Sequence, residues 1–174
     1  MALWYDGGRG DHGRTPPPEH ARPAPNRHRR GSRHVTQQAT SILELAGGAA
    51  GIFAIVEDFY RRIEADERMR SLYPADLEPG KEKLRLFLVQ WLGGPPKYTE
   101  KYGHPRLRLR HFPFVIGEWH AGRWLRYMRE AWTANGVPVE AMNVVFERLG
   151  PLAHHMVNDK DDVPRTPLGD VRLS

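Results

Sequence analysis

Between residues 41 and 158, apolar side chains recur at steps of three and four positions, and no stretch alternates between apolar and polar residues. Ile52, Ile55, Phe59 and Ile63 show this spacing most clearly. Such steps match the α-helix, which has about 3.6 residues per turn, whereas a half-buried strand repeats every two residues. The chain is therefore expected to be all-α.

The apolar repeats predict four main helices separated by glycine and proline. Helices commonly end at glycine, and proline removes a backbone donor inside a helix. Gly93-Gly94-Pro95-Pro96 is therefore a strong stop, and Gly150-Pro151 should kink or split the last helix. The expected helical segments are 42–46, about 52–63, a short turn at 69–73, 81–92, 118–134 and 139–157, with a largely irregular loop over 95–115 that holds one helical turn near 108–110.

The chain divides into three segments by composition. Residues 1–40 are rich in Pro, Gly, Arg and His and bury too little apolar surface to offset the entropy of ordering, so we expect a disordered extension. Residues 41–158 form one domain, because 174 residues leave room for one ordinary domain and a tail. Residues 159–174 are polar and contain proline, and we expect a flexible C-terminal tail.

The formal charge of +5 is unevenly distributed along the chain. Seven arginines stand against three acidic residues in the first 40 positions, so the extension carries most of the charge and the rest is close to neutral. Nucleic-acid binding by the folded part is therefore not expected, because it needs a basic surface. The extension is interpreted as a solvated arm, with contact to acidic lipid or nucleic acid as the alternative.

The chain has no cysteine. This excludes disulfides, thiolate zinc sites, iron–sulfur clusters and cysteine nucleophiles, and it fits a cytoplasmic protein. No segment reaches the roughly 20 apolar residues needed to cross a membrane. Arg29-Arg30 before the apolar stretch Leu45–Val56 resembles an export signal, but Glu44 and Glu57 flank that stretch, so export is the weaker alternative.

Five histidines lie outside the extension, and none has a spacing typical of a zinc or di-iron site. The sequence also lacks a glycine-rich phosphate loop and a nucleophile elbow. His111 is the unusual histidine, because Arg110 precedes it and Phe112-Pro113-Phe114 follow it. A single histidine near aromatic residues is more often structural than a metal ligand, so its surroundings must decide.

Polar aromatic residues are the second unusual feature. Tyr60 and Trp124 lie on the apolar faces of two different helices, and Tyr73 follows a short helical turn. In a purely apolar core each would bury an O–H or N–H group. A buried donor left without a partner costs about 1–3 kcal/mol of stability. Three such donors indicate a polar object inside the domain, and a haem that carries a small ligand would serve.

A series of motifs resembles the group II truncated haemoglobins in order and spacing over about residues 43–158. The most specific parts are the sequence HPRLRLRH at 104–111, Pro113-Phe114, and Trp124. The other matching parts are Gly47-Gly48, Ile55-Val56, Phe59-Tyr60, Tyr73-Pro74, LRLFL at 84–88, Gly93-Gly94-Pro95, His154 and Val157-Asn158. The resemblance implies an all-α truncated globin, a two-over-two helical sandwich around one haem b (iron protoporphyrin IX).

By this resemblance, His111 is the proximal ligand of the haem iron, and Tyr60, Tyr73 and Trp124 form the distal ligand-binding side. Gly80 takes the position of a distal histidine, although the segment after Tyr73 is one residue short, which leaves a neighbour of Gly80 as an alternative. The other residues implied for the haem pocket are Phe59, Leu84, Phe87 and Phe114, with Arg110, Lys83 and Tyr98 as partners of the haem propionates.

The implied function is binding of O2, NO and CO at the sixth position of a histidine-ligated iron. Hydrogen bonds from the aromatic donors would slow oxygen release, so we expect oxygen or nitric oxide chemistry or sensing more than transport. One alternative is a non-haem helical binding domain whose basic tail engages nucleic acid. Another is haem-dependent turnover of nitric oxide or peroxide, which needs an external electron donor because the sequence has no flavin or nicotinamide motif. The sequence leaves homo-oligomer formation open.

Overall fold

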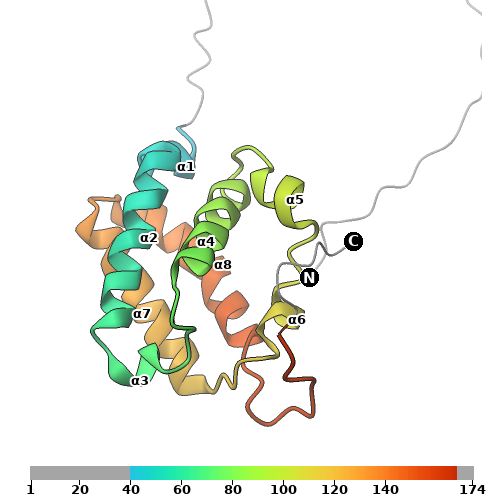
Figure 1. Ribbon diagram of the computed structural model, residues 1–174. Helices are drawn as coiled ribbons and strands as arrows, with labels where there is room; N and C mark the ends of the chain where they lie inside the picture. Colours follow the sequence, from blue (N-terminus) through green and yellow to red (C-terminus); the bar gives the residue numbers. More distant parts are fainter. Residues whose placement is uncertain (1–39, 168–174) are drawn as a thin grey trace, which may run out of the picture. The chain divides into compact units, whose positions relative to one another are not determined.

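The computed structural model describes residues 40–167, so the disordered extension expected over 1–40 lies, apart from Thr40, outside the described residues. The described residues form eight α-helices and no strand, which confirms the all-α prediction (Figure 1). The helices are α1 (Ile42–Leu45), α2 (Gly48–Glu64), α3 (Glu67–Arg70), α4 (Glu78–Trp91), α5 (Lys97–Tyr102), α6 (Leu107–His111), α7 (Glu118–Ala134) and α8 (Val139–His155).

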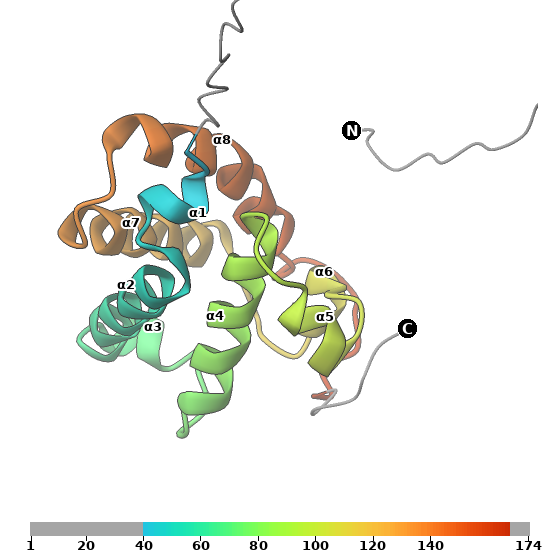
Figure 2. The same cartoon turned by 90° about the horizontal axis from the view of Figure 1, so that it is seen from above.

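The four long helices form two layers, α2 with α4 and α7 with α8 (Figure 1). Helix α2 also packs against α7 and so joins the two layers. The short helices α5 and α6 lie near each other beyond α4, as Figure 2 shows from above. This arrangement is the two-over-two sandwich that the resemblance implied.

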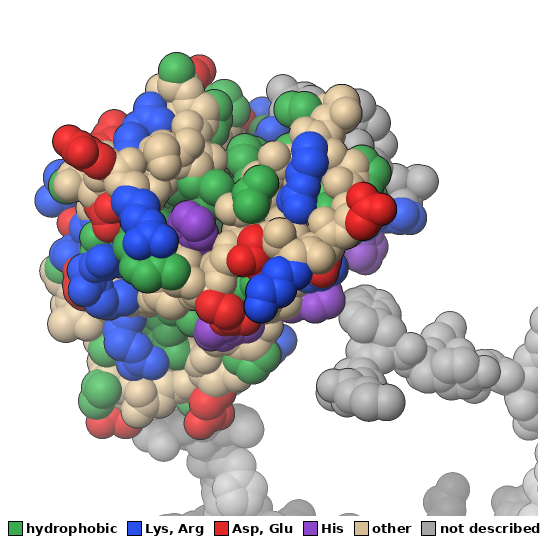
Figure 3. Space-filling model, turned by 90° about the horizontal axis from the view of Figure 1, so that it is seen from below, with side chains coloured by type: hydrophobic (Ala, Val, Ile, Leu, Met, Phe, Trp, Pro, Cys, Tyr) green, Lys and Arg blue, Asp and Glu red, His purple; other side chains and the backbone are tan. Residues whose placement is uncertain are grey.

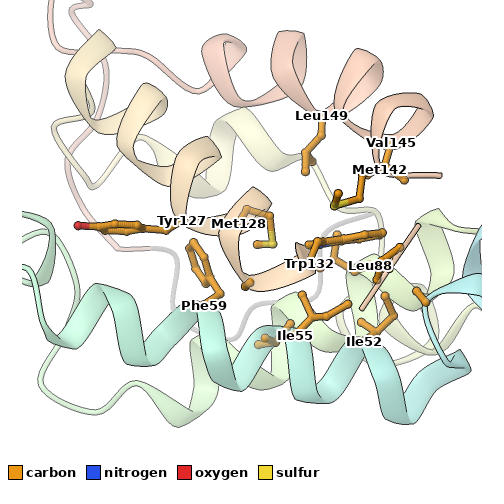
Figure 4. Packing of buried hydrophobic residues seen from close by; sticks show 14 of the residues in the cluster. Ile52, Ile55, Phe59, Leu88, Tyr127, Met128, Trp132, Met142, Val145 and Leu149 are labelled. Atoms are coloured by element: carbon orange, nitrogen blue, oxygen red, sulfur yellow. The ribbon is translucent and has the colours of Figure 1, made fainter. Parts of the chain in front are cut away.

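The packed core lies where α7 passes between α2 and α8. Trp132 and Met128 of α7 are fully buried there. Ile52 and Ile55 of α2 contact this cluster from one side and Val145 of α8 from the other (Figure 4). Burial of each such apolar side chain contributes roughly 1.5–3 kcal/mol. The core therefore fixes the relative position of the two layers.

Helix α5 lies in the loop over 95–115 that was expected to be largely irregular. Its residues have no apolar repeat that would predict it, and Gln90 of α4 holds it from outside. The Gln90 amide nitrogen donates to Thr99 Oγ1 (2.7 Å), and the amide oxygen accepts the Thr99 backbone N–H (3.0 Å). The helical turn predicted near 108–110 is confirmed as α6.

The last helix, α8, continues through Pro151, so the split expected at Gly150-Pro151 does not occur. Proline at this position lacks the N–H that would bond to the carbonyl four residues earlier, and its ring crowds that carbonyl. The packing of α8 on α7, with Phe146 and Leu149 buried, offsets that loss.

Part of the segment expected to be a flexible tail is attached to the domain. Arg165 donates hydrogen bonds to the backbone carbonyl oxygens of Phe112 (2.9 Å) and Asn158 (2.9 Å). Residues 159–167 therefore lie against the loop that follows α6, whereas 168–174 are outside the described residues.

The face of the molecule in Figure 3 shows Lys and Arg side chains interspersed with Asp and Glu, without one continuous basic patch. This agrees with the near-neutral charge of the sequence after residue 40. Among the described helices, none combines the length and apolar character needed to cross a membrane.

The corner between α1 and α2 depends on Gly51. A Cβ atom at this position would lie 1.7 Å from the carbonyl oxygen of Ala46, far inside any allowed contact. Gly47 helps to form the corner, because its φ of 82° lies in the left-handed region that favours glycine. The chain can thus turn from α1 into α2 only if residue 51 has no side chain.

Replacement of Gly51 by alanine is expected to lower the free energy of unfolding by about 1–3 kcal/mol or more, since backbone must move to admit the methyl group. Gly122 of α7 is the matched control, because a Cβ atom at this position would have no neighbouring atom within 4 Å. Gly122→Ala should raise stability by about 0.5–1 kcal/mol through helix propensity. Urea unfolding measures both, and a Gly51→Ala protein as stable as the wild type would contradict the tight corner.

Candidate functional site

A cavity of about 450 Å³ lies among α2, α4, α6, α7 and α8. All but one of the residues predicted for the site line this cavity, although they come from segments far apart in the sequence. Those that line it are Tyr60, Tyr73, Gly80, Lys83, Leu84, Phe87, Tyr98, Arg110, His111, Phe114 and Trp124. The exception is Phe59.

His111 reaches the cavity from the C-terminal end of α6. Its Nδ1 atom lies 2.6 Å from the carbonyl oxygen of Leu107, one turn earlier in the same helix. A carbonyl oxygen only accepts, so Nδ1 carries the proton and Nε2 keeps its lone pair. Burial lowers the pKa of His111, while the bond to Leu107 acts in the opposite direction. The imidazole is therefore neutral at physiological pH, the form that binds a metal.

Helix α6 begins with an unusual backbone at Arg106. Its φ of 37° lies in the left-handed region, which non-glycine residues rarely adopt. The Arg106 N–H donates to His104 Nδ1 (3.2 Å), which supports this turn. At the other end of the helix, Arg110 Nη2 donates to the carbonyl oxygen of Tyr102 (3.0 Å) and ties α6 to α5.

The tyrosines and the tryptophan predicted for the distal side form one cluster. Tyr60 comes from α2, Tyr73 follows α3, and the two rings pack edge to face with centroids 5.8 Å apart. Trp124 comes from α7 and makes a side-chain hydrogen bond with Tyr73. Since an indole N–H only donates, Tyr73 is the acceptor. The indole N–H and the two hydroxyls therefore lie together on one side of the cavity.

Burial raises the pKa of Tyr60, and the negative charge of Glu78 adds to that effect. Burial likewise raises the pKa of Tyr73, with a further contribution from Tyr60 and an opposing one from the Trp124 hydrogen bond. Both hydroxyls therefore keep their protons through the physiological range. The cluster offers neutral hydrogen-bond donors on this side of the cavity.

Gly80 lies at the start of α4 and faces the hydroxyl of Tyr60. A Cβ atom at Gly80 would be 2.7 Å from Tyr60 Oη. Any side chain at residue 80 would therefore push the Tyr60 hydroxyl out of its present position. Gly80 therefore lines the cavity, together with its neighbour Pro79.

Phe59 is the one residue predicted for the site that does not line the cavity. It is fully buried behind the wall, with its ring 5.4 Å from that of Tyr60 and 5.3 Å from that of Trp124. Successive residues on a helix point about 100° apart, and here Tyr60 is directed to the cavity while Phe59 is directed to the core. Phe59 supports the two polar aromatics from the core side.

The remaining wall is apolar, and sequence reasoning identified only part of it. Leu84 and Phe87 of α4 and Phe114 after α6 were predicted. Residues of α8 and its C-cap also line the cavity and were not predicted for it; they are Leu149, Leu152, Ala153 and Met156. His120 of α7 is a further lining residue that was not predicted, and its Nδ1 accepts the backbone N–H of Gly117 (3.1 Å).

The three residues predicted as partners of the haem propionates, Lys83, Tyr98 and Arg110, lie together at one part of the cavity wall. Lys83 Nζ is 5.4 Å from the ring centroid of Tyr102, and Arg110 donates to the backbone of the same residue. Tyr98 packs against Phe87 and Tyr102 with centroids 5.9 and 5.3 Å apart. Helix α5 thus brings Lys83, Tyr98 and Arg110 to one region.

Comparison with known proteins agrees with this geometry. Residues 41–158 match the model of the bacterial-like globin family. Over 112 residues the chain is 40% identical to the group 2 truncated haemoglobin YjbI of Bacillus subtilis (strain 168), covering 64% of this chain and 85% of that protein. The chain belongs to the group II truncated haemoglobins.

Solved structures of truncated haemoglobins and related globins superpose on the fold described above. The haemoglobin of the thermophilic phototrophic bacterium Chloroflexus aurantiacus is 50% identical, with a TM-score of 0.65, over 68% of this chain and 98% of that one. The truncated oxygen-avid haemoglobin of Bacillus subtilis is 40% identical, with a TM-score of 0.64, over 68% of this chain and 99% of that one. The globin family implies a haem cofactor and oxygen binding.

The described residues fit a haem. The cavity volume of about 450 Å³ is within the range of roughly 300–1,000 Å³ that is typical of ligand and cofactor sites. Its walls are mainly apolar, one neutral imidazole reaches it with a lone pair, and cations lie at one part. These are the features that a porphyrin with iron and two carboxylates requires.

The raised tyrosine pKa values predict how stability changes at high pH. A group whose pKa is higher in the folded than in the unfolded protein favours folding below the unfolded value, about 10 for tyrosine, and that contribution is lost as pH rises further. The stability of Tyr60→Phe and Tyr73→Phe should therefore fall less steeply above about pH 10 than that of the wild type. Urea unfolding over this pH range measures the slopes.

Phe59→Leu serves as the control for that experiment, because it alters the same cluster without removing a hydroxyl. It should lower stability by a similar amount at every pH. Slopes above pH ~10 that are equal in the wild type and both tyrosine variants would contradict burial of the two hydroxyls.

Proposed function

We propose that this globin binds one haem b through His111 and holds a small diatomic ligand by hydrogen bonds from Tyr60, Tyr73 and Trp124. The role that follows is oxygen or nitric oxide chemistry or sensing, more than transport. The observation that carries the proposal is the neutral imidazole of His111, whose Nδ1 is held by Leu107 at 2.6 Å while neutral aromatic donors line the same cavity.

His111 is suited to hold iron because its tautomer is fixed. The Leu107 carbonyl accepts the Nδ1 proton and restrains rotation of the ring, so Nε2 is the atom that offers a lone pair. Burial keeps the ring neutral, which prevents a proton from competing for that nitrogen. When bound, the haem supplies an iron with an open position for O2, NO or CO.

Lys83, Tyr98 and Arg110 are proposed to hold the haem propionates. A guanidinium forms charge-assisted hydrogen bonds to carboxylates, and it stays protonated in proteins. The Tyr102 carbonyl restrains Arg110, so its position does not depend on the cofactor. Leu84, Phe87 and Phe114 would contact the apolar part of the macrocycle.

The aromatic donors are expected to slow the release of an iron-bound ligand that carries partial negative charge. A charge-assisted hydrogen bond contributes about 1.5–3 kcal/mol, and two of them would slow release by one to several orders of magnitude. A related structure is that of a truncated oxygen-avid haemoglobin, which supports strong oxygen binding here as well. Tight binding is unfavourable for a carrier. Redox turnover would require an external electron donor.

Oxygen dissociation measured by stopped flow tests this proposal. Tyr60→Phe and Trp124→Phe should each release oxygen about 10- to 100-fold faster than the wild type, because each loses a donor or its support. Tyr127→Phe is the matched control, since Tyr127 is a tyrosine of α7 that donates to Asp66 (2.8 Å) and does not line the cavity. Its oxygen release should be unchanged. Wild-type rates in both cavity variants would refute the proposal.

A further inference from the structure

The loop after His111 is joined to the segment after α8 through Asn158, which is 1% exposed. Asn158 Nδ2 donates to the carbonyl oxygen of His111 (3.1 Å). Its Oδ1 accepts the Ile116 N–H (3.3 Å), and its own N–H donates to the Ile116 carbonyl (2.8 Å). One buried amide thus contacts both the histidine's own backbone and the end of the loop that follows it.

Arg165 reinforces this connection from seven residues further along the chain. Its Nη1 donates to the carbonyl oxygens of Phe112 (2.9 Å) and Phe114 (3.4 Å) and to Asn158 Oδ1 (2.7 Å). Its Nη2 donates to the carbonyls of Asn158 (2.9 Å) and Asp161 (3.2 Å). A planar guanidinium can serve so many acceptors at fixed angles, and a lysine ammonium cannot.

Arg108 makes the reciprocal connection from α6. It lies three residues before His111 and donates to the carbonyl oxygens of His155 and Val157 at the end of α8. It also pairs with the carboxylate of Asp161. Two arginines therefore connect the same two parts of the chain. Arg108 donates from α6 to the segment at and after the end of α8, and Arg165 donates from that segment to the loop after α6.

These bonds matter because α6 is too short to fix its own orientation. It has five residues, all of them only partly buried, whereas an isolated helix is marginal below roughly 12–15 residues. Apolar packing therefore restrains α6 only weakly. The carbonyl groups at its C-terminal end, which have no partners within the helix, need donors from elsewhere. Asn158 and Arg165 supply such donors directly at and after His111.

We propose that Arg165, acting with Asn158, is a positioning residue that sets the orientation of the His111 imidazole toward the haem. This rests on the proposed function, in which His111 binds the iron. Arg165 lies beyond residues 41–158, the part of the chain that matches the family model. Pro167, two residues further on, lines the cavity, so the same segment reaches the site itself.

Arg165→Met, which keeps the apolar stem but removes every donor, is compared with Arg165→Lys in the haem-loaded protein. Resonance Raman spectra of the ferrous form give the iron–histidine stretching band, and transfer to excess apomyoglobin gives the rate of haem loss. Arg165→Met should shift and broaden the band and speed haem loss about 10- to 100-fold, as for other residues that hold metal ligands in place. Arg165→Lys should lie between it and the wild type.

Lys160→Met is the control, because Lys160 is an exposed cation on the same segment, and it should behave as the wild type. If Arg165→Met lowers only the melting temperature and leaves band and haem loss at wild-type values, Arg165 is merely structural and the proposal is overturned. If Arg165→Met fails to fold, wild-type values in Arg165→Lys overturn it. A wild-type protein without an iron–histidine band would instead refute the proposed function.

Discussion

The hydrogen bond from His111 Nδ1 to the carbonyl oxygen of Leu107 determines which ring nitrogen faces the cavity. A histidine that could exchange tautomers or rotate freely would bind a metal weakly and in several geometries. The bond lies within a five-residue helix, so the stability of that helix becomes the limiting factor. Side-chain hydrogen bonds from α6 to α5 and to the end of α8, and the bond from Arg165 to the loop after α6, all restrain this one helix.

The donor cluster is built in a different way. Tyr60 and Trp124 project from long helices that also contribute to the core, and Phe59 packs against both from behind. Their positions are therefore determined by close packing. The same burial that fixes the tyrosines raises their pKa values, and so keeps them as hydrogen-bond donors. Structural stability and ligand chemistry on this side share the same side chains.

The sequence predicted what depends on local periodicity and on the family's motifs. The bounds of α7 were predicted correctly, since its apolar residues repeat regularly and a glycine follows its end. Helix α5 was missed because a tertiary contact, Gln90 with Thr99, holds a polar segment in place. Phe59 lies behind Tyr60 and not at the cavity surface, a difference in side-chain direction that the order of residues alone does not reveal. Nothing in the local sequence marks Arg165, because its acceptors in the loop after α6, the carbonyls of Phe112 and Phe114, lie about fifty residues earlier.

The absorbance spectrum of purified protein in which His111 is replaced by alanine tests the central claim most directly. His154→Ala is the comparison, because that histidine is half exposed and pairs with Glu118 on the surface. We expect the first variant to lose most of its haem and its Soret band, with added imidazole restoring part of both, and the second to keep them. A His111→Ala protein with a full haem complement and an unchanged Soret band would contradict the assignment of His111 as the iron ligand.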